Sequence, residues 1–272
     1  ISSLIESTLY KIERGISYLN SASQKTRQVY TDLNLDETLA QKKITLTGYK
    51  SRIPSLQESQ LQSIINDVNE IIATTPLTIH VTETINIVPY LSYDDVNKTY
   101  SDKATDFKET LQELNSRIDQ RLEAKLIHTT YLSDEIEDYI LIKRIITPQN
   151  SLKDISVMEF IPKTLAASQS LDFFSLNPEV TSSGNYLQVK YTFSSLDSST
   201  PNVILYKIPS TSIDLVKDIK SVILPTDLQE KDIPFECGNA ICNPAEDYLS
   251  CPEDCTCGNK ICESNEDKQN CP

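Results

Sequence analysis

The residues best suited to covalent chemistry in this chain are its cysteines, and they are confined to the C-terminal end. They fall in two copies of a twenty-residue repeat, CGNAICNPAEDYLSCP from residue 237 and CGNKICESNEDKQNCP from residue 257, which agree at nine of sixteen positions. Each copy has only one or two aliphatic side chains, too few to bury a core, so a cross-link must hold it. We expect disulfides, formed in an oxidising compartment, among Cys237, Cys242, Cys251, Cys255, Cys257, Cys262 and Cys271.

The number of cysteines is odd, because the first copy has four and the second has three before Pro272. We interpret the second copy as a repeat cut short, so we expect the natural chain to continue beyond Pro272. Four cysteines allow three pairings, and the sequence does not distinguish them. Zinc is the alternative cross-link, but the gaps of four, eight, three and one residues favour disulfides over a zinc site.

Carboxylate and amide side chains recur at equivalent places in the two repeats. Hard oxygen ligands gathered in a short cross-linked loop are what Ca²⁺ binds, although the spacing of an EF-hand is absent. The alternative is a solvated acidic loop. The possible calcium ligands are Asn239, Glu246, Asp247 and Asp254 in the first repeat and Asn259, Glu266 and Asp267 in the second.

The composition excludes several classes of function. The chain carries 39 acidic and 25 basic residues, a net charge of −14, so it lacks the excess of cations that nucleic-acid binding requires. No run of apolar residues is long enough to span a bilayer, so we expect no membrane span within this chain. The segment before residue 237 has no cysteine to act as a nucleophile, and the five glycines form no nucleotide-binding motif.

Few residues indicate catalysis, and we expect no enzymatic activity. His80 is interpreted as a surface residue of a strand, and His128 as a residue that follows a helix and caps it. They are 48 residues apart, so the chain has no H-E-x-x-H site. Two carboxylates could build a glycosidase, and the candidates are the acidic residues Asp94, Asp95, Asp134, Glu135, Glu137 and Asp138. A solvated surface is the alternative interpretation for all six.

Residues 1–137 have the pattern of a helical region with a strand pair. Apolar steps of four and three predict a helix over residues 1–35, with a seam of Ile5, Leu9, Ile12, Ile16 and Leu19. Gly15 within it suggests the close approach of another element. A second helix should begin near Ser55, where Ser55 and Glu58 form a capping box, and end at Pro76. Alternation from Leu77 to Ile87 predicts an amphipathic strand or a hairpin, and a third helix is expected over residues 101–127.

Residues 138–225 have the pattern of a β-sandwich. Short β-branched or aromatic segments separated by turn residues are typical of the immunoglobulin-like class. The segments are 138–147, 153–161, 171–176, 185–193 and 202–208. Residues 226–236 form a linker before the repeats at 237–256 and 257–272. The predicted fold is therefore α+β and multidomain, with a helical region, a sandwich and disulfide-rich repeats.

Two stretches resemble known proteins. The pattern CGN-x-x-C-x₃-ED-x₃-CP-x-DC resembles the tandem cysteine repeats of secreted and cell-surface proteins of archaea, especially of small-genome symbiotic lineages. Residues 138–225 are similar to a sandwich domain of such proteins, through the IPK-x-LA turn at Ile161–Ala166. The resemblance covers residues 138–272 and implies an extracellular structural or adhesive role. Ala245 and Asn265 depart from the glycine that many of these repeats have there.

The sequence therefore predicts a non-enzymatic extracellular surface protein, structural or adhesive, such as a filament or surface-layer subunit. Its partners would be further copies of itself or other cell-envelope proteins. The alternative is a ligand-binding or carbohydrate-binding ectodomain with a membrane anchor beyond Pro272, and a secreted hydrolase is less favoured. A concave pocket lined by aromatics such as Tyr186, Tyr191 or Phe193 would favour ligand binding. Asn97 heads the sequon Asn-Lys-Thr and is a candidate glycosylation site in a secreted protein.

The cross-link prediction can be checked by measuring the mass of the intact, non-reduced chain with and without a chelator. We expect a mass two hydrogens below the reduced value for every disulfide, unchanged when the denatured protein meets the chelator. Under native conditions, bound calcium would appear as extra mass that the chelator removes. Fully reduced thiols that lose zinc to the chelator would contradict the prediction.

Overall fold

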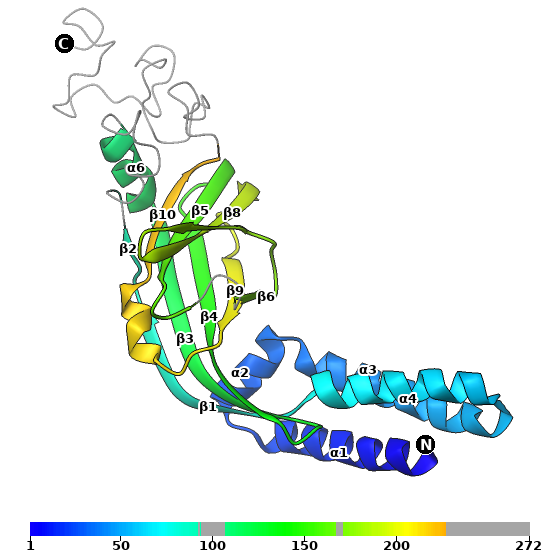
Figure 1. The fold of residues 1–272 in the computed structure, drawn as a ribbon. Helices are drawn as coiled ribbons and strands as arrows, with labels where there is room; N and C mark the ends of the chain where they lie inside the picture. Colours follow the sequence, from blue (N-terminus) through cyan, green and yellow to red (C-terminus); the bar gives the residue numbers. More distant parts are fainter. Residues whose placement is uncertain (92, 94–106, 167–170, 227–272) are drawn as a thin grey trace, which may run out of the picture. The chain divides into compact units, whose positions relative to one another are not determined.

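The structure, a computed structural model, describes residues 1–91, 93, 107–166 and 171–226 (Figure 1). Helices at the N-terminus are followed by two largely antiparallel sheets, which confirms the α+β class. The chain divides into two compact units. The first consists of Ile1–Ile85, Ala124–Leu141 and Pro209–Ile213, and the second contains the other described residues. The expected domain boundary at residue 137 falls within a strand.

The first part of the chain is helical up to its first long strand. Its elements are α1 Ser2–Ser21, α2 Gln24–Asp32, α3 Leu35–Arg52, the 3₁₀ turn η1 Ile53–Ser55, α4 Glu58–Thr74 and β1 Pro76–Ile87. The later elements are β2 Tyr90–Leu91, α6 Phe107–Ser116, β3 Ile118–Tyr131, β4 Ile136–Pro148, β5 Leu152–Pro162, β6 Asp172–Phe173, β7 Glu179–Ser183, β8 Tyr186–Leu196, β9 Asn202–Ile208, η2 Ile213–Asp218 and β10 Lys220–Pro225. No helix among the described residues is long and apolar enough to cross a membrane.

The strands form two five-stranded sheets. Sheet A has the order β1-β3-β4-β9-β6, and sheet B has the order β2-β10-β5-β8-β7. In sheet B, β10 pairs with β5, β5 with β8 and β8 with β7, all antiparallel, while the short β2 runs parallel to β10. Strands β3 and β4 of sheet A contribute residues to both units.

The helix predicted over residues 1–35 is two helices. Ser23 breaks it, because its side chain accepts a hydrogen bond from the backbone N–H of Thr26 and caps the start of α2. Two residues of the predicted seam, Ile5 and Ile12, are fully buried in the first unit, and the other three are half-buried: Leu9, Ile16 and Leu19. Helix α1 packs against α3, and ion pairs of 2.9 Å join these helices: Glu13 with Lys43, and Glu6 with Lys50.

The second predicted helix begins three residues later than expected. Helix α4 starts at Glu58, and the residues that cap it reciprocally are Gln57 and Gln60 rather than Ser55 and Glu58. The segment from Leu77 to Ile87 is one continuous strand, β1, and not a hairpin. Strand β1 lies at the edge of sheet A, where β3 is its single, long partner.

Gly15 lies where β1 passes α1, which confirms the close approach predicted from the sequence. A Cβ atom at this position would stand 3.0 Å from the carbonyl oxygen of Leu77 and 3.3 Å from a methyl of the same residue. A backbone oxygen cannot move aside as a flexible side chain can. Glycine therefore lets the helix and the strand pack closely.

Replacing this glycine gives a test with a matched control in a neighbouring helix. Gly15→Ala should lower the free energy of unfolding by about 1 kcal/mol, because the overpacking outweighs the better helix propensity of alanine. Gly48→Ala in α3, where a Cβ meets nothing within 4 Å, should raise that free energy by up to about 1 kcal/mol. Urea unfolding of the two variants checks this. Equal stabilisation by both changes would show that the contact at Gly15 is not tight.

The helix predicted over residues 101–127 is wrong in its second half. Helix α6 ends at Ser116, and β3 begins at Ile118. The apolar residues Ile118 and Leu122 fit a helical spacing of four, but they also fit an alternating pattern of buried and exposed positions. Buried Gln120 interrupts the apolar alternation that would have shown the strand. His128 consequently lies inside β3 and does not cap a helix.

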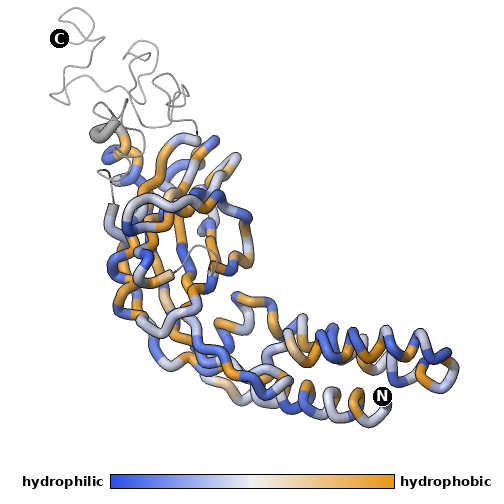
Figure 2. Tube along the Cα trace, viewed as in Figure 1, coloured by the Kyte–Doolittle hydropathy of each residue, from blue (hydrophilic) through white to orange (hydrophobic). Residues whose placement is uncertain are grey.

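The second unit contains the facing parts of the two sheets, where the hydrophobic residues concentrate (orange in Figure 2). The ring of Phe173 from sheet A lies 6.1 Å, between centroids, from that of Tyr191 in sheet B. The opposite face of sheet B is covered by α6. The buried hydrophobic residues between α6 and this face of sheet B are Leu111, Met158, Phe160, Val222 and Leu224.

A charged group lies between the two sheets. Arg144 of β4 and Glu159 of β5 are both fully buried, with Nη1 3.4 Å from Oε1. Arg144 also donates hydrogen bonds to Gln120 and, at 2.6 Å, to the Ser221 hydroxyl. Burial raises the pKa of the Glu159 carboxyl, while Arg144 and the hydroxyl of Tyr206 act in the opposite direction. The sheets are thus joined by polar contacts that have one favourable geometry.

Breaking this pair on one side should cost much more stability than replacing it whole. Arg144→Met leaves the Glu159 carboxyl buried without its partner, and we expect a loss of about 3–5 kcal/mol in the free energy of unfolding. The double variant Arg144→Met/Glu159→Leu should recover part of that loss, since it removes both buried charges. Chemical denaturation of the wild type, both single variants and the double variant measures the coupling. Additive losses would contradict a direct interaction.

Candidate functional site

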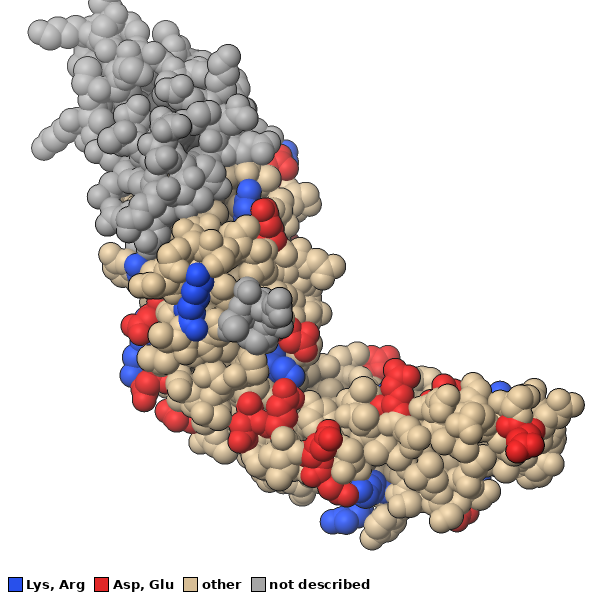
Figure 3. Space-filling model, viewed as in Figure 1, with Lys and Arg blue, Asp and Glu red and all other residues tan. Residues whose placement is uncertain are grey.

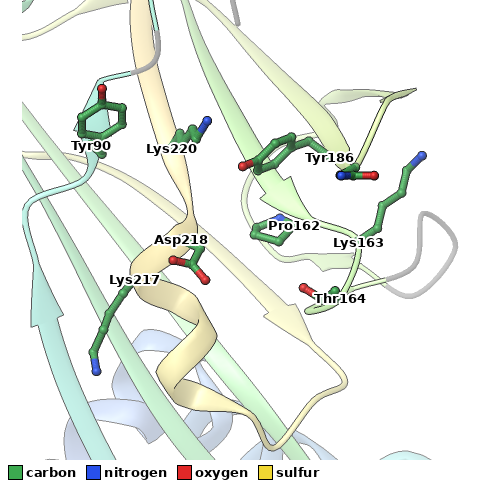
Figure 4. A pocket seen from close by; sticks show the side chains of 9 residues that line it. Tyr90, Pro162, Lys163, Thr164, Tyr186, Lys217, Asp218 and Lys220 are labelled. Atoms are coloured by element: carbon green, nitrogen blue, oxygen red, sulfur yellow. The ribbon is translucent and has the colours of Figure 1, made fainter.

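A hollow of about 680 Å³ on the second unit is the best candidate for a binding site (Figure 4). Its volume is in the range of small-ligand pockets. It forms where the end of β5 and the start of β8 lie near the end of η2 and the start of β10. The lining residues are Tyr90, Pro162, Lys163, Thr164, Asn185, Tyr186, Lys217, Asp218 and Lys220.

One wall of the hollow is a tightly held turn. Pro162 and Tyr186 are the last register partners of β5 and β8. Beyond them the backbone N–H of Lys163 donates to the carbonyl of Asn185 at 2.9 Å, and Lys163 Nζ donates to the carbonyl of Gly184 at 2.7 Å. Gly184 has a φ of 54°, a left-handed conformation that favours glycine. The turn therefore holds its polar residues in a defined place.

The aromatic floor of the hollow is Tyr186. Its ring meets the buried ring of Phe160 edge to face, with 6.5 Å between centroids. On the other side Lys220 Nζ lies 4.8 Å from the centre of the Tyr186 ring. A cation over an aromatic face is held by the negative charge density of the ring. Tyr186 thus joins an apolar surface to a cationic group at the same point.

The opposite wall comes from β2 and η2. Tyr90 is 66% exposed, and it is the Cα partner of Lys220 in the parallel pairing of β2 with β10. Lys217 Nζ lies 2.7 Å from an oxygen of Asp214, and this ion pair lowers the pKa of the Asp214 carboxyl. In Figure 4 Tyr90 and Tyr186 lie on opposite sides of Lys220.

The charge of the hollow contrasts with that of the chain. Three lysines and one carboxylate, Asp218, line it, whereas the whole chain carries −14. On the face drawn in Figure 3, acidic and basic side chains are scattered among uncharged residues. Lys217 is paired with Asp214, so among the lining residues the ammonium groups of Lys163 and Lys220 stand against the carboxylate of Asp218. Two ammonium groups beside exposed Tyr90 and half-buried Tyr186 suit a ligand that has both an anionic group and an apolar face. A pair of carboxylates, as in a glycosidase, is not found among the residues that line this hollow.

The residues predicted to form sites are placed as follows. Tyr186 lines the hollow, but Tyr191 is buried between the sheets, and Phe193 is half-buried in β8 outside the lining. The cysteines, the possible calcium ligands of the repeats, Asn97, Asp94 and Asp95 all lie outside the described residues. The lysines of the hollow and Tyr90 were not predicted. Tyr186 and the turn at Ile161–Ala166 were the features of the sequence that pointed to this region.

The acidic stretch near the β3–β4 turn contacts several partners and forms no common site. Asp134 accepts a hydrogen bond of 2.7 Å from Lys11, and Glu137 accepts one of 2.6 Å from the hydroxyl of Tyr131. Asp138 lies 2.7 Å from Nδ1 of His128, and Glu135 is exposed. The three carboxylates Asp134, Glu137 and Asp138 therefore contact three different side chains.

Comparison with known proteins does not assign a family. The chain matches no protein-family model, and a search of curated protein sequences gives no match.

Proposed function

We propose that this chain is a non-enzymatic protein of the cell exterior with an adhesive or structural role, and that the hollow binds an acidic carbohydrate. The observation that carries the proposal is the 4.8 Å contact between Lys220 Nζ and the Tyr186 ring, inside a hollow that Tyr90 also lines. The proposal takes the binding of a ligand as the means of adhesion.

The chemistry of the lining explains the choice of ligand. A sugar ring has an apolar C–H face that packs on an aromatic ring, and the hollow offers two such rings, exposed Tyr90 and half-buried Tyr186. The carboxylate or sulfate of an acidic sugar would lie beside Lys220 and Lys163. The side-chain amide of Asn185 both donates and accepts hydrogen bonds, as sugar hydroxyls require.

The location and the finer architecture belong to the same proposal. The two cysteine repeats support an oxidising exterior, where disulfides would hold them and their oxygen ligands would bind Ca²⁺. The packed sheets would form an immunoglobulin-like sandwich that presents the hollow. If a membrane anchor follows Pro272, the same site would serve a surface-bound ectodomain.

Self-association is a second candidate, supported by a specific observation on the helices. The large hydrophobic side chains most exposed on α1 and α3 are Tyr10 and Ile44, each 63% exposed. These two side chains would contact another copy or another envelope protein, because the predicted seam itself is occupied within the first unit. Sedimentation of the wild type and of Tyr10→Ser/Ile44→Ser would show whether the pair mediates assembly.

Carbohydrate binding can be tested by titrating the full chain with an oligosaccharide of uronic acids and with its neutral counterpart. Tyr186→Ala should weaken binding of both sugars about tenfold or more, a loss of about 1.4 kcal/mol, because both stack on the ring. Lys220→Gln should weaken binding of the acidic sugar alone, and added salt should do the same for the wild type.

The matched controls lie on the helices of the first unit. Tyr49→Ala removes a half-buried tyrosine that has a cation, Arg52, 5.3 Å from its ring centre, and Lys25→Gln removes an exposed lysine, so both should leave the affinity unchanged. An equal loss in either control, or no binding of either sugar by the wild type, would refute the proposed site.

A further inference from the structure

The two histidines of this chain lie side by side, although 48 residues separate them in the sequence. His80 is in β1 and His128 is in β3, and these strands are neighbours in sheet A. The ring centroids are 6.4 Å apart, with 45° between the ring planes. Both side chains reach solvent, and that of His128 is 38% exposed.

The partner of His128 determines which of its ring nitrogens carries the proton. Nδ1 lies 2.7 Å from an oxygen of Asp138 in β4. An ionised carboxylate only accepts hydrogen bonds, so Nδ1 must be the donor. In the neutral ring Nε2 then has a lone pair directed away from Asp138.

His80 is held by Tyr18 of α1. The Tyr18 hydroxyl donates to the carbonyl of Ile79 at 3.0 Å. The same oxygen lies 2.9 Å from Nδ1 of His80 and 3.4 Å from Nε2, and the two rings meet edge to face with 5.2 Å between centroids. Tyr18 therefore restricts the position of the His80 ring.

The contact between His128 and Asp138 is the one found around histidines that bind metals. A metal-binding imidazole donates its second ring N–H to a carboxylate or another acceptor, which fixes its tautomer and its orientation. We propose that His80 and His128 together bind a late first-row transition-metal dication, such as Cu²⁺ or Zn²⁺, through their Nε2 atoms. Imidazole is a preferred ligand of both ions.

Water would complete the coordination. Among the described residues no group of three His, Cys, Asp and Glu side chains is arranged to hold a metal ion, so the protein supplies two donors. Two imidazoles on one tetrahedral ion have ring centroids about 5 Å apart, given metal–nitrogen distances of about 2 Å. The observed 6.4 Å requires a closing movement of about 1 Å, which side chains at the surface can make. Asp138 is a positioning residue, because it orients the ring of His128.

The site does not depend on the proposed function. The hollow belongs to the second unit, whereas both histidines and their partners belong to the first. A bound ion would link β1 to β3 and would stabilise the folded chain, because the unfolded chain does not bring the two imidazoles together.

The test uses the full, untagged chain, freed of metal and with its cysteines oxidised, titrated with Cu²⁺. Electron paramagnetic resonance should show two nitrogen ligands, and Zn²⁺ should compete for the site. His80→Gln and His128→Gln should each lower the Cu²⁺ affinity at least about tenfold and leave a one-nitrogen spectrum. The C-terminal repeats are the same in every variant, so any ion that they bind is a constant background.

Two carboxylate variants separate positioning from general charge. Asp138→Asn keeps both imidazoles, so it should weaken Cu²⁺ binding about tenfold while the two-nitrogen spectrum remains. Asp134→Asn, whose partner is Lys11, is the matched control and should change nothing. A wild-type spectrum with fewer than two nitrogens, or an affinity that survives His80→Gln or His128→Gln, would overturn the proposal. Equal effects of Asp138→Asn and Asp134→Asn on the Cu²⁺ affinity would also overturn the proposal. This comparison needs neither glutamine variant, so it can be made even if one of them fails to fold.

Discussion

The buried pair of Arg144 and Glu159 is the constraint on which the second unit depends. Each charge loses its hydration when the sheets close, so each must meet its partner in a good geometry or the packed state is penalised. Hydrophobic contacts between two sheets tolerate small shifts, but this pair does not. Because Gln120 and Ser221 also bind Arg144, four strands are held in one mutual position.

This constraint extends to the outer face of sheet B through the alternation of β5. Glu159 faces the other sheet, so its neighbour Phe160 faces outward, where it packs against Leu111 of α6 and the ring of Tyr186. Lys220 is the register partner of Phe160 and shares that face. The residue that fixes the sheets from inside is thus one position away from the residue that supports the hollow.

Much of the fold follows from sequence periodicity, and the failures have physical causes. Strands β4, β5, β6, β8 and β9 were found because turn residues separate short β-branched runs, whereas β7 and β10 lie outside the predicted segments. Helix α3 was missed because Leu39 and Leu46 are its only fully buried side chains, too few to make an apolar stripe. Strand β3 was missed because the spacing of Ile118 and Leu122 fits both a helix and a strand. Pairing with the neighbouring strands of sheet A makes this segment a strand. The hollow and the histidine pair are formed by segments that are far apart in the sequence. Local sequence patterns do not predict which distant segments come into contact.

Because the chain passes repeatedly between the two units, a single proteolytic cut has a limited effect on the fold. The described chain crosses from one unit to the other five times, at residues 85, 123, 141, 208 and 213. A single cut by a protease would therefore leave both halves of the chain anchored in folded structure. A nick that would separate two units joined by one linker would leave these two units connected.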